Sequence, residues 1–386
     1  MVKRIVNLSK SHSFFLFGPR ATGKSTLLQA NYPDALYIDL LDSVLDERLA
    51  QDPNNLKDMI AAAPDKQWIV IDEVQKNPKL LDVVHSLSKN KKIKFALTGS
   101  SARKLKRGEA NLLAGRAFKY FCHPLTYLEL ADNFKIDEIL QFGSLPEIFD
   151  LSMNDKSEYL RAYVDTYFKE EIVAEQIIRK LRPFQNFLKV AAQMNGKILN
   201  LNKISNDVGV DHSTVQNYFE ILEDTLVGFH LEPFHESIRK RQRQASKFYY
   251  FDLGVTRALK KIAAQPLIND SYEYGDAFEH FLILEIKRLS DYFQPDWQFS
   301  YLATKDNAEI DLIIERPTMK RVAVEIKSTK NIKSLDSTTL TTLEKLSGDI
   351  PKCDTYLLSQ DPIEQKIGHI WCLPWQKGLK EIGLVK

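Results

Sequence analysis

Residues 13–29 read SFFLFGPRATGKSTLLQ, in which a short apolar run is followed by a glycine-rich turn and then by Lys-Ser-Thr. The segment from Gly18 to Ser25 satisfies the G-x-x-x-x-G-K-[ST] pattern. Glycines let successive backbone N–H groups curve around phosphate oxygens, and the positive N-terminal end of the next helix adds to that attraction. The stretch therefore predicts a strand, a loop and a helix that bind a nucleotide phosphate, rather than a glycine-rich turn without a ligand.

The residues of this loop have different expected roles. Lys24 would reach the β- and γ-phosphates of ATP, and the Ser25 hydroxyl would ligate Mg²⁺. ATP and Mg²⁺ are therefore the expected ligands of the N-terminal region. The residues expected to contact the nucleotide are Gly18, Pro19, Arg20, Ala21, Thr22, Gly23, Lys24, Ser25 and Thr26.

A second element of this site is WIVIDE at residues 68–73, an apolar run that ends in two carboxylates. Asp72 would hold Mg²⁺, usually through water, and Glu73 would polarise the attacking water. The alternative is a strand that merely ends in solvated acids. The next apolar run, FALTGSSA at 95–102, contains Thr98, which would lie between the strands of the other two motifs and sense the γ-phosphate.

Arg116 is a candidate arginine finger, whose charge would stabilise the transferred phosphoryl group. It follows a glycine in LLAGRAFKYF, and a structural role is the alternative. Whether Arg116 would act on ATP of its own chain or of a neighbouring subunit depends on the oligomeric state. A homo-oligomer is one possibility.

Four segments together, GPRATGKSTLL, IDEVQKNPKLLDVVHSL, LTGSSARKL and LAGRAF…PLTYLEL, resemble the AAA-type ATPases of bacteria and archaea. The resemblance is to the branch that carries a C-terminal domain of unknown function, and it continues through the whole chain. It implies an ATP-binding, Mg²⁺-dependent ATPase core. Because the biological role of this family is poorly defined, the resemblance does not supply the task of the ATPase.

The distribution of apolar runs predicts an α/β protein of three domains. Short, near-continuous apolar runs such as SFFLF and WIVI are typical of buried parallel strands, with helices between them. From about residue 155 to 225 the spacing of apolar residues is helical, and charged residues are frequent. From about 275 to 386 helical and strand patterns are mixed again. We expect a P-loop ATPase domain at 1–150, a helical and winged helix-turn-helix region at 151–265 and a restriction-endonuclease-like domain at 266–386.

The middle region carries a pattern typical of a winged helix-turn-helix. A helix around LNKISNDVG is followed by a turn at Gly209 and by a second helix that starts near DHSTVQNYF, with Asp211 or Ser213 as its cap. In that geometry the N-terminal residues of the second helix face the base edges of the major groove. The residues in question can all form hydrogen bonds: His212, Ser213, Thr214, Gln216 and Asn217.

A basic segment lies between the two strands that would form the wing. Cations suit contacts with DNA phosphates. The alternative is a winged helix that binds a protein, with a loop that is only solvated. The cations of this segment are Arg239, Lys240, Arg241, Arg243 and Lys247.

The last third has the order of acidic residues that is typical of PD-(D/E)XK nucleases. Asp311 lies in the strand AEIDLIIE, and Glu325 and Lys327 lie in RVAVEIKS after a short turn. The period of two puts Glu325 and Lys327 on one face, where Asp311 can join them. Asp311, Glu325 and the carbonyl of Ile326 would bind Mg²⁺ or Mn²⁺.

In this nuclease hypothesis Lys327 would help to orient or activate water, and Glu279 would complete the acidic cluster from a preceding helix. The sequence departs from the strict motif, because no proline precedes Asp311. The same charged residues could also be buried structural ion pairs, so that the nuclease fold would be inert.

The composition argues against several other classes of protein. The chain has 386 residues and a formal net charge of +2, so any nucleic-acid surface must be local. Three widely separated cysteines argue against a zinc site or a disulfide framework. No apolar stretch has the length of a membrane span. We expect a soluble, cytoplasmic protein.

The functional hypothesis is an ATPase that controls a DNA-binding, nuclease-like C-terminal half. The alternative is an ATP-dependent switch or adaptor that binds a protein partner through that half. A small-molecule kinase is disfavoured, because the Asp72–Glu73 pair suits hydrolysis and no lid for an acceptor substrate is recognisable.

Overall fold

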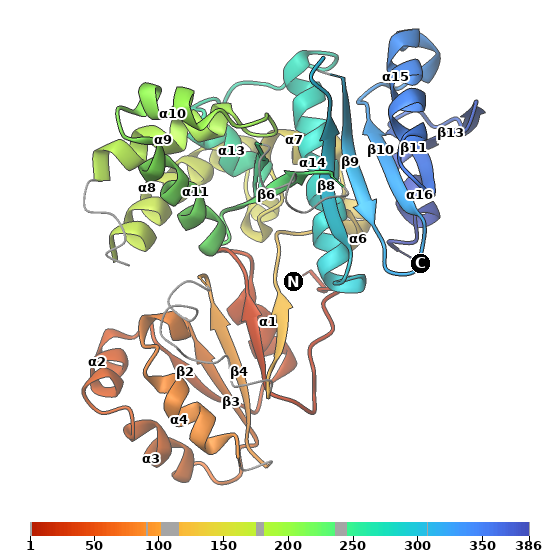
Figure 1. Ribbon diagram of the computed structural model, residues 1–386. Coiled ribbons are helices and arrows are strands. Elements are labelled where there is room, and N and C mark those ends of the chain that lie inside the picture. Colours follow the sequence, from red (N-terminus) through yellow and green to blue (C-terminus); the bar gives the residue numbers. More distant parts are fainter. Residues whose placement is uncertain are drawn as a thin grey trace. The chain divides into compact units, whose positions relative to one another are not determined.

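The computed structural model describes residues 2–89, 92–101, 116–174, 181–235, 245–306 and 308–385, with the backbone alone at 167–174 (Figure 1). The chain forms two compact units. The first consists of Met1–Glu129, Leu145–Glu147 and Phe219–Val227, and the second of Leu130–Ser144, Ile148–Tyr218 and Gly228–Lys386. The division into three domains stays a prediction.

The first unit is built on a five-stranded parallel sheet with the order β2-β3-β4-β1-β5. Its strands are β1 (Phe14–Phe17), β2 (Leu36–Asp39), β3 (Trp68–Asp72), β4 (Lys94–Gly99) and β5 (Phe118–Phe121). Its helices are α1 (Lys24–Asn31), α2 (Ser43–Gln51), α3 (Asn55–Ala61) and α4 (Leu80–Leu87). The predicted α/β fold with buried parallel strands is confirmed.

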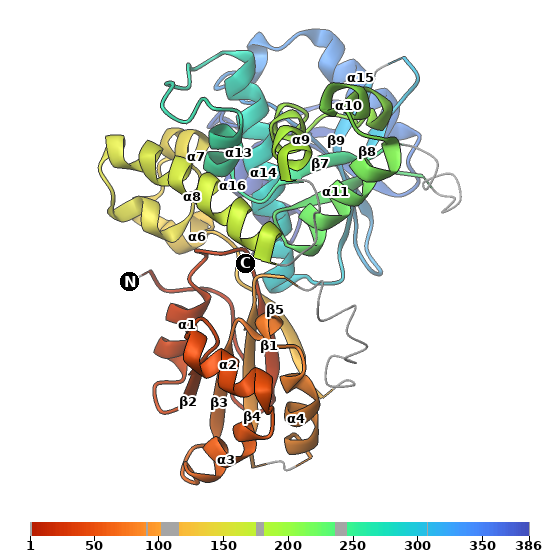
Figure 2. The ribbon, with the colours of Figure 1, turned by 90° about the vertical axis from the view of Figure 1, so that its left-hand side faces the viewer.

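Helices cover both faces of this sheet, which explains why its strands are apolar on both faces (Figure 2). Phe15, Ile71 and Leu97 alternate onto the face covered by α2, α3 and α4. Phe14 and Leu16 alternate onto the face covered by α1. Because β4 lies between β1 and β3, the carboxyl ends of these three strands meet at one edge.

Between β5 and β6 the chain is mainly helical. The helices of this stretch are α6 (Tyr127–Leu130), α7 (Ile136–Phe142), α8 (Met153–Ala174), α9 (Leu181–Gln193), α10 (Leu201–Val208) and α11 (His212–Asp224). Later helices are α13 (Leu253–Leu259), α14 (Tyr272–Phe293), α15 (Ser337–Gly348) and α16 (Trp375–Glu381). Among the described residues, none of the helices combines the length and the apolar character that a membrane crossing needs.

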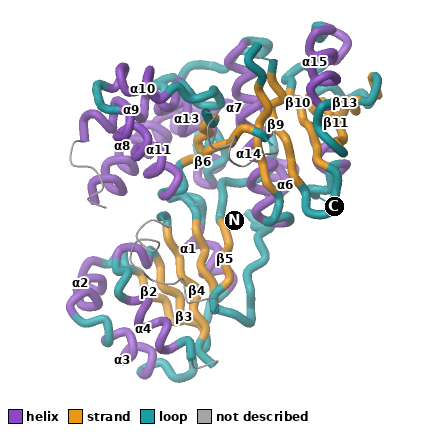
Figure 3. Tube along the Cα trace, viewed as in Figure 1, coloured by secondary structure: helices purple, strands orange, loops and turns teal. Residues whose placement is uncertain are grey.

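The second unit contains a mixed eight-stranded sheet with the order β12-β13-β11-β10-β9-β8-β6-β7 (Figure 3). Its strands are β6 (Gly228–Pro233), β7 (Lys247–Tyr250), β8 (Gln298–Ala303), β9 (Glu309–Glu315), β10 (Arg321–Ile326), β11 (Cys353–Ser359), β12 (Gln365–Ile367) and β13 (Ile370–Pro374). The β6–β7 hairpin extends this sheet, because Glu232 and Pro233 pair in parallel with Ser300 and Tyr301 of β8. The strand pair after α11 and the strands of the last third therefore share one sheet.

Candidate functional site

The glycine-rich loop follows the carboxyl end of β1 and leads into α1. A Cβ atom at Gly18 would lie 2.2 Å from the carbonyl oxygen of Cys122, so no larger residue fits. Gly23 has φ +85°, a left-handed conformation that glycine adopts without strain. Pro19 is buried and Arg20 is half-buried, while Ala21 and Thr26 are exposed. The strand, loop and helix lie where the sequence pattern places them.

Lys24 is 5% exposed, and its ammonium group lies along the loop. Its Nζ donates to the carbonyl oxygens of Gly18 (2.9 Å) and Pro19 (3.0 Å) and lies 3.9 Å from Oε1 of Glu73. The Thr22 hydroxyl donates to Pro19 at 2.9 Å and closes the loop. A cation thus lies at the loop whose backbone would surround the phosphates.

Two residues that sequence analysis missed support this loop from outside. Arg4 donates through Nη1 to the carbonyl oxygen of Thr22 (2.7 Å) and through Nε to Glu129 (2.7 Å). The other carboxylate oxygen of Glu129 accepts from the backbone of Thr126 at 2.9 Å. Nothing in a single sequence signals a contact between residues so far apart along the chain.

Asp72 and Thr98 meet at the same edge of the sheet. Asp72 is 3% exposed and accepts from the Thr98 hydroxyl, which itself accepts from the backbone N–H of Glu73 at 2.9 Å. The Tyr37 hydroxyl donates to Asp72 at 2.6 Å and also hydrogen-bonds Ser25. Burial and the Asp72 carboxylate raise the pKa of Tyr37, which keeps its proton. The sequence did not indicate a role for Tyr37, although its hydroxyl contacts both expected Mg²⁺ ligands, Ser25 and Asp72.

Glu73 is buried and held in a constrained conformation directly after β3. Its φ of 57° lies in the left-handed region, which costs a residue with a side chain about 1–2 kcal/mol. Its Oε2 accepts from Gln75 and, at 3.1 Å, from Ser100, and Gln75 also donates to Ser100 at 2.8 Å. Backbone strain of this kind is concentrated at functional sites.

Arg116 does not lie with these residues. It is exposed and precedes β5, which runs parallel to β1 and pairs Phe118 with Phe14. Arg116 therefore lies at the amino end of the sheet, whereas the loop follows the carboxyl end of β1. The four residues of β1 alone separate these edges by about 13 Å. The structure does not bring Arg116 to the loop of its own chain.

Residues 10–131 match the model of a protein family described as an AAA domain. The N-terminal segment is similar to an AAA domain. Residues 133–266 and 274–377 match two domains of unknown function (DUF8612 and DUF4143). Lys24, Asp72, Glu73 and Thr98, which converge at one edge of the parallel sheet, all lie within the residues that match the AAA domain.

The chain is also similar to several proteins of bacteria and archaea. An uncharacterized protein of Mycobacterium tuberculosis is 26% identical over 80% of this chain and 68% of its own. An uncharacterized protein of Methanocaldococcus jannaschii is 24% identical over 81% of this chain and 75% of its own. Among solved structures, the replication initiator DnaA bound to AMPPCP and single-stranded DNA is 16% identical over 56% of this chain and 83% of its own, with a TM-score of 0.29.

A second group of charged side chains lies in the C-terminal sheet. The antiparallel register of β9 and β10 pairs Leu312 with Val324, so Asp311 and Glu325 come next along the two strands and share a face. Oδ2 of Asp311 accepts from the backbone of Ile326 at 2.8 Å. Lys327 lies 2.7 Å from Oε1 of Glu325. The structure thus brings Asp311, Glu325 and Lys327 together.

Glu279 of α14 belongs to the same electrostatic group but has other partners. Its Oε1 accepts from the Tyr249 hydroxyl at 2.7 Å and lies 3.6 Å from Nζ of Lys247. Burial and the nearby Asp311 raise the pKa of Glu279 to about 7. The same two causes raise the pKa of Glu325 to about 8. Both carboxyl groups therefore lie where a further positive charge would stabilise their ionised forms.

The structure tests how well these groups suit a divalent metal. Oε2 of Glu325 is buried and has no hydrogen-bond partner in the described structure, and hard cations such as Mg²⁺ and Mn²⁺ prefer such oxygens. Asp311 and Glu325 fit the expected ligand pair. Across the described part of the chain, no three His, Cys, Asp or Glu side chains are grouped as metal ligands, and the place of Glu279 in the acidic cluster stays a prediction.

The interpretation of Lys247 as a phosphate-binding cation of the wing is wrong. Lys247 is the first residue of β7 and is only 3% exposed. Its ammonium group pairs with Glu309 and lies near Glu279, and it cannot reach DNA from there. The other four cations of the wing, Arg239, Lys240, Arg241 and Arg243, lie outside the described residues.

Two consecutive helices, α10 and α11, lie where the sequence predicts a helix-turn-helix. Gly209 ends α10 with φ +75°, and the side chain of Asn200 caps its start. Asp211 caps α11, because it accepts from the backbone and the hydroxyl of Thr214 and from the hydroxyl of Ser213. His212, Ser213, Gln216 and Asn217 are exposed, and Thr214 is half-buried.

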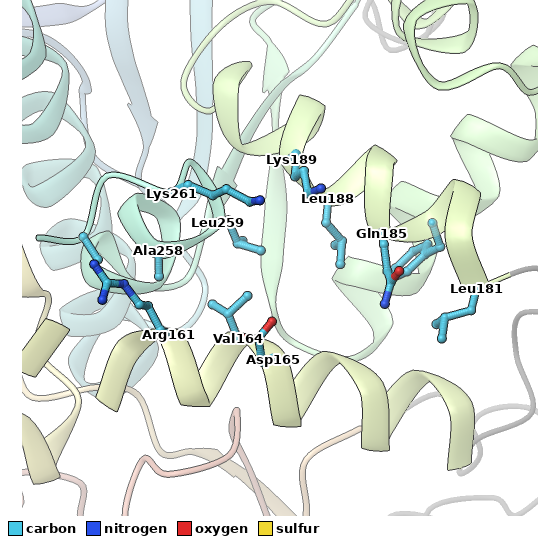
Figure 4. Close-up of a pocket in the computed structure, with 12 residues that line it drawn as sticks. Arg161, Val164, Asp165, Leu181, Gln185, Leu188, Lys189, Ala258, Leu259 and Lys261 are labelled. Atoms are coloured by element: carbon cyan, nitrogen blue, oxygen red, sulfur yellow. The ribbon is translucent and has the colours of Figure 1, made fainter. Parts of the chain in front are cut away.

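A cavity of about 430 Å³ lies among α8, α9 and α13 (Figure 4). Leu181, Leu188 and Leu259 contribute apolar surface, and Arg161 and Asp165 contribute charges. Residues 175–180, between α8 and α9 in the sequence, lie outside the described part, so we assign no ligand to this cavity.

Proposed function

We propose that this protein is a Mg²⁺-dependent ATPase in which ATP binding and hydrolysis control a DNA-binding, nuclease-like C-terminal half. The observation that carries the proposal is the convergence of Lys24, Asp72, Glu73 and Thr98 at the loop edge of the AAA domain. The three proposed domains correspond to residues 1–150, 151–265 and 266–386.

The residues of the AAA domain fit ATP and Mg²⁺. Backbone N–H groups of the loop and the Lys24 ammonium bind the phosphates, while Ser25 and Asp72 hold Mg²⁺. Bound Mg²⁺ neutralises phosphate charge. Glu73 orients and polarises the attacking water, and Thr98 positions the Glu73 backbone and would detect the γ-phosphate. The position of Arg116 supports a finger role only toward the ATP of a second subunit.

The C-terminal half supplies the proposed action on DNA. The exposed polar start of α11 suits the major groove, where side chains hydrogen-bond base edges. Asp311 and Glu325 would hold Mg²⁺ or Mn²⁺, and Lys327 would stabilise negative charge on the phosphodiester. The buried oxygen of Glu325, which has no hydrogen-bond partner among the residues that the structure describes, supports this assignment.

The alternative function is an ATP-dependent adaptor whose C-terminal half binds a protein. The observation that favours it is that buried charges have oppositely charged partners: the buried Glu325 pairs with Lys327, and the buried Lys247 pairs with Glu309. Such pairs can hold a fold together without any catalysis.

The dependence of the ATPase rate on DNA distinguishes the two functions. We expect double-stranded DNA to raise the rate of ATP hydrolysis at low salt, and the effect to shrink as salt rises, because phosphate contacts release counterions. Replacing both His212 and Asn217 with alanine should reduce the stimulation. Asn202→Ala, at an exposed position of α10, is the matched control. A rate that ignores DNA under all these conditions would favour the adaptor.

Cleavage of DNA is the second expected result. Purified protein should cut single- or double-stranded DNA in Mn²⁺ or Mg²⁺, and Glu325→Ala should lower the rate about 100-fold or more by removing a metal ligand. Gel assays with and without ATP measure this, with Glu344→Ala on an exposed part of α15 as the control. Protein that binds DNA but never cuts it would reduce the C-terminal half to a DNA-binding scaffold.

A further inference from the structure

Lys247 lies in an unusual place for a lysine, and the proposed function does not use it. Its side chain is buried at the start of β7, where it pairs with Glu309 and lies 3.6 Å from Glu279. Burying an unpaired ammonium group is costly, so a lysine stays charged in such a position only when carboxylates compensate it. Here Glu279, Asp311 and Glu309 outweigh the effect of burial and raise the pKa of Lys247.

Strand β7 presents two donors to the same carboxylate. Lys247 and Tyr249 are two residues apart, so their side chains share a face of the strand. The Tyr249 hydroxyl donates to Oε1 of Glu279, the oxygen that Lys247 also approaches. Glu279 is thereby held toward β7.

The carboxylates of the cluster therefore fall into two pairs. Glu279 and Glu309 are compensated by Lys247 from β7. Asp311 and Glu325 lie opposite each other on β9 and β10, and Oε2 of Glu325 has no partner among the described residues although its side chain is only 9% exposed. Among the described residues, the buried carboxylate oxygen of this cluster that has no hydrogen-bond partner, Oε2 of Glu325, belongs to the second pair.

The charges of the cluster also separate the Glu279–Glu309 pair from the Asp311–Glu325 pair. With every group ionised, the four carboxylates and the ammonium groups of Lys247 and Lys327 have a formal charge of −2, a state that burial and mutual repulsion oppose in the absence of a further cation. One divalent cation compensates that charge. A second divalent cation would have to compete with the Lys247 ammonium for Glu279 and Glu309.

We propose that Lys247 occupies a cation position of this cluster and thereby limits it to one divalent cation, which Asp311 and Glu325 bind. This inference rests on the proposed nuclease-like function and adds a positioning residue to it. Lys247 acts through Glu279 and Glu309 and does not itself touch the metal ion or DNA.

The test is to count Mn²⁺ ions on the nucleotide-free full-length protein by calorimetry and by the paramagnetic resonance signal of free Mn²⁺. Wild type should bind one Mn²⁺ that Glu325→Ala removes. Lys247→Met keeps the length of the side chain without its charge and should bind a second Mn²⁺. The double variant Lys247→Met, Glu279→Gln should return to one, and Lys247→Arg should behave as wild type.

The outcomes separate this inference from the proposed function. One Mn²⁺ on both wild type and Lys247→Met, with equal affinity, would overturn the inference and leave the nuclease hypothesis standing. No Mn²⁺ on wild type but one on Lys247→Met would overturn the inference, because Asp311 and Glu325 would then hold no ion in the native protein, and it would also remove the metal from the proposed function. No Mn²⁺ on either protein would overturn both.

A second variant keeps the inference testable if Lys247→Met does not fold, which circular dichroism would reveal. Glu279→Gln retains Lys247 and Tyr249 and changes a group that we place outside the metal shell. Its Mn²⁺ affinity should stay close to that of wild type, whereas loss of a true ligand should weaken binding about 10–100-fold or more. A loss of that size in Glu279→Gln would overturn the inference.

Discussion

Replacing Lys24 with alanine is expected to abolish ATP binding in practical assays, with an affinity loss of about 100-fold or more. The ammonium group lies against the carbonyls of Gly18 and Pro19 at the loop, and we expect it to turn to the β- and γ-phosphates when ATP binds. Arg20 also belongs to the loop, but the loop pattern assigns the contact with the β- and γ-phosphates to Lys24. Titration with a fluorescent ATP analogue in Mg²⁺ measures the loss.

The matched control for this variant is Lys57→Ala, which removes an exposed lysine from α3 of the same unit. Circular dichroism should show that both variants fold. Wild-type affinity in Lys24→Ala would contradict the assignment of this loop as the phosphate-binding site.

Glu73→Gln is expected to slow ATP hydrolysis about 100-fold or more while ATP still binds. The amide keeps the size of the side chain and can still hydrogen-bond Gln75 and Ser100, but it cannot accept a proton from water. Single-turnover hydrolysis and nucleotide titration on the same preparation separate the two effects.

Glu47→Gln, at an exposed position of α2, is the control for charge removal. The assignment of roles predicts that Lys24→Ala and Glu73→Gln differ in kind. An equal loss of ATP binding in both variants would refute it, because Glu73 would then be needed for affinity rather than for chemistry.

The local parts of the ATP site could be predicted from the sequence because they lie within short segments. The loop pattern and the acids after an apolar run are each read within about ten residues. The supporting contacts could not be predicted in this way. Tyr37 contacts Asp72 from another strand, and Arg4 pairs with Glu129, which lies 125 residues later in the chain. Such partners depend on the order of strands in the sheet, which one sequence does not reveal.

The fate of Lys247 shows a different limit. In the sequence it follows a run of cations, and charge alone suggested a common role in the wing. In the structure it begins a strand of four buried residues, and its burial is made possible by Glu309, which lies far along the chain. The position of Lys247 next to a basic run therefore predicted solvent exposure wrongly. The apolar residues that follow Lys247 correctly indicate a buried strand.

The position of Arg116 depended on strand direction. The sequence segment that contains Arg116 was recognisable. Whether Arg116 lies near the loop, however, depends on whether β5 is parallel or antiparallel to β1. Because the two strands are parallel, the same residue lies at the edge of the sheet away from the loop. Sequence analysis had left both a structural role and action on a neighbouring subunit open.

The shared sheet of β6, β7 and β8 limits how this gene can be divided or recombined. Family models treat residues 133–266 and 274–377 as separate entities, but the pairing of β6 with β8 and the contacts of Lys247 with Glu279 and Glu309 cross that boundary. If a gene fusion exchanged only one of the two segments, the new protein would lose the pairing of β6 with β8 and the buried contacts of Lys247 with its carboxylate partners. The two segments should therefore be inherited as a pair, whatever ATPase precedes them.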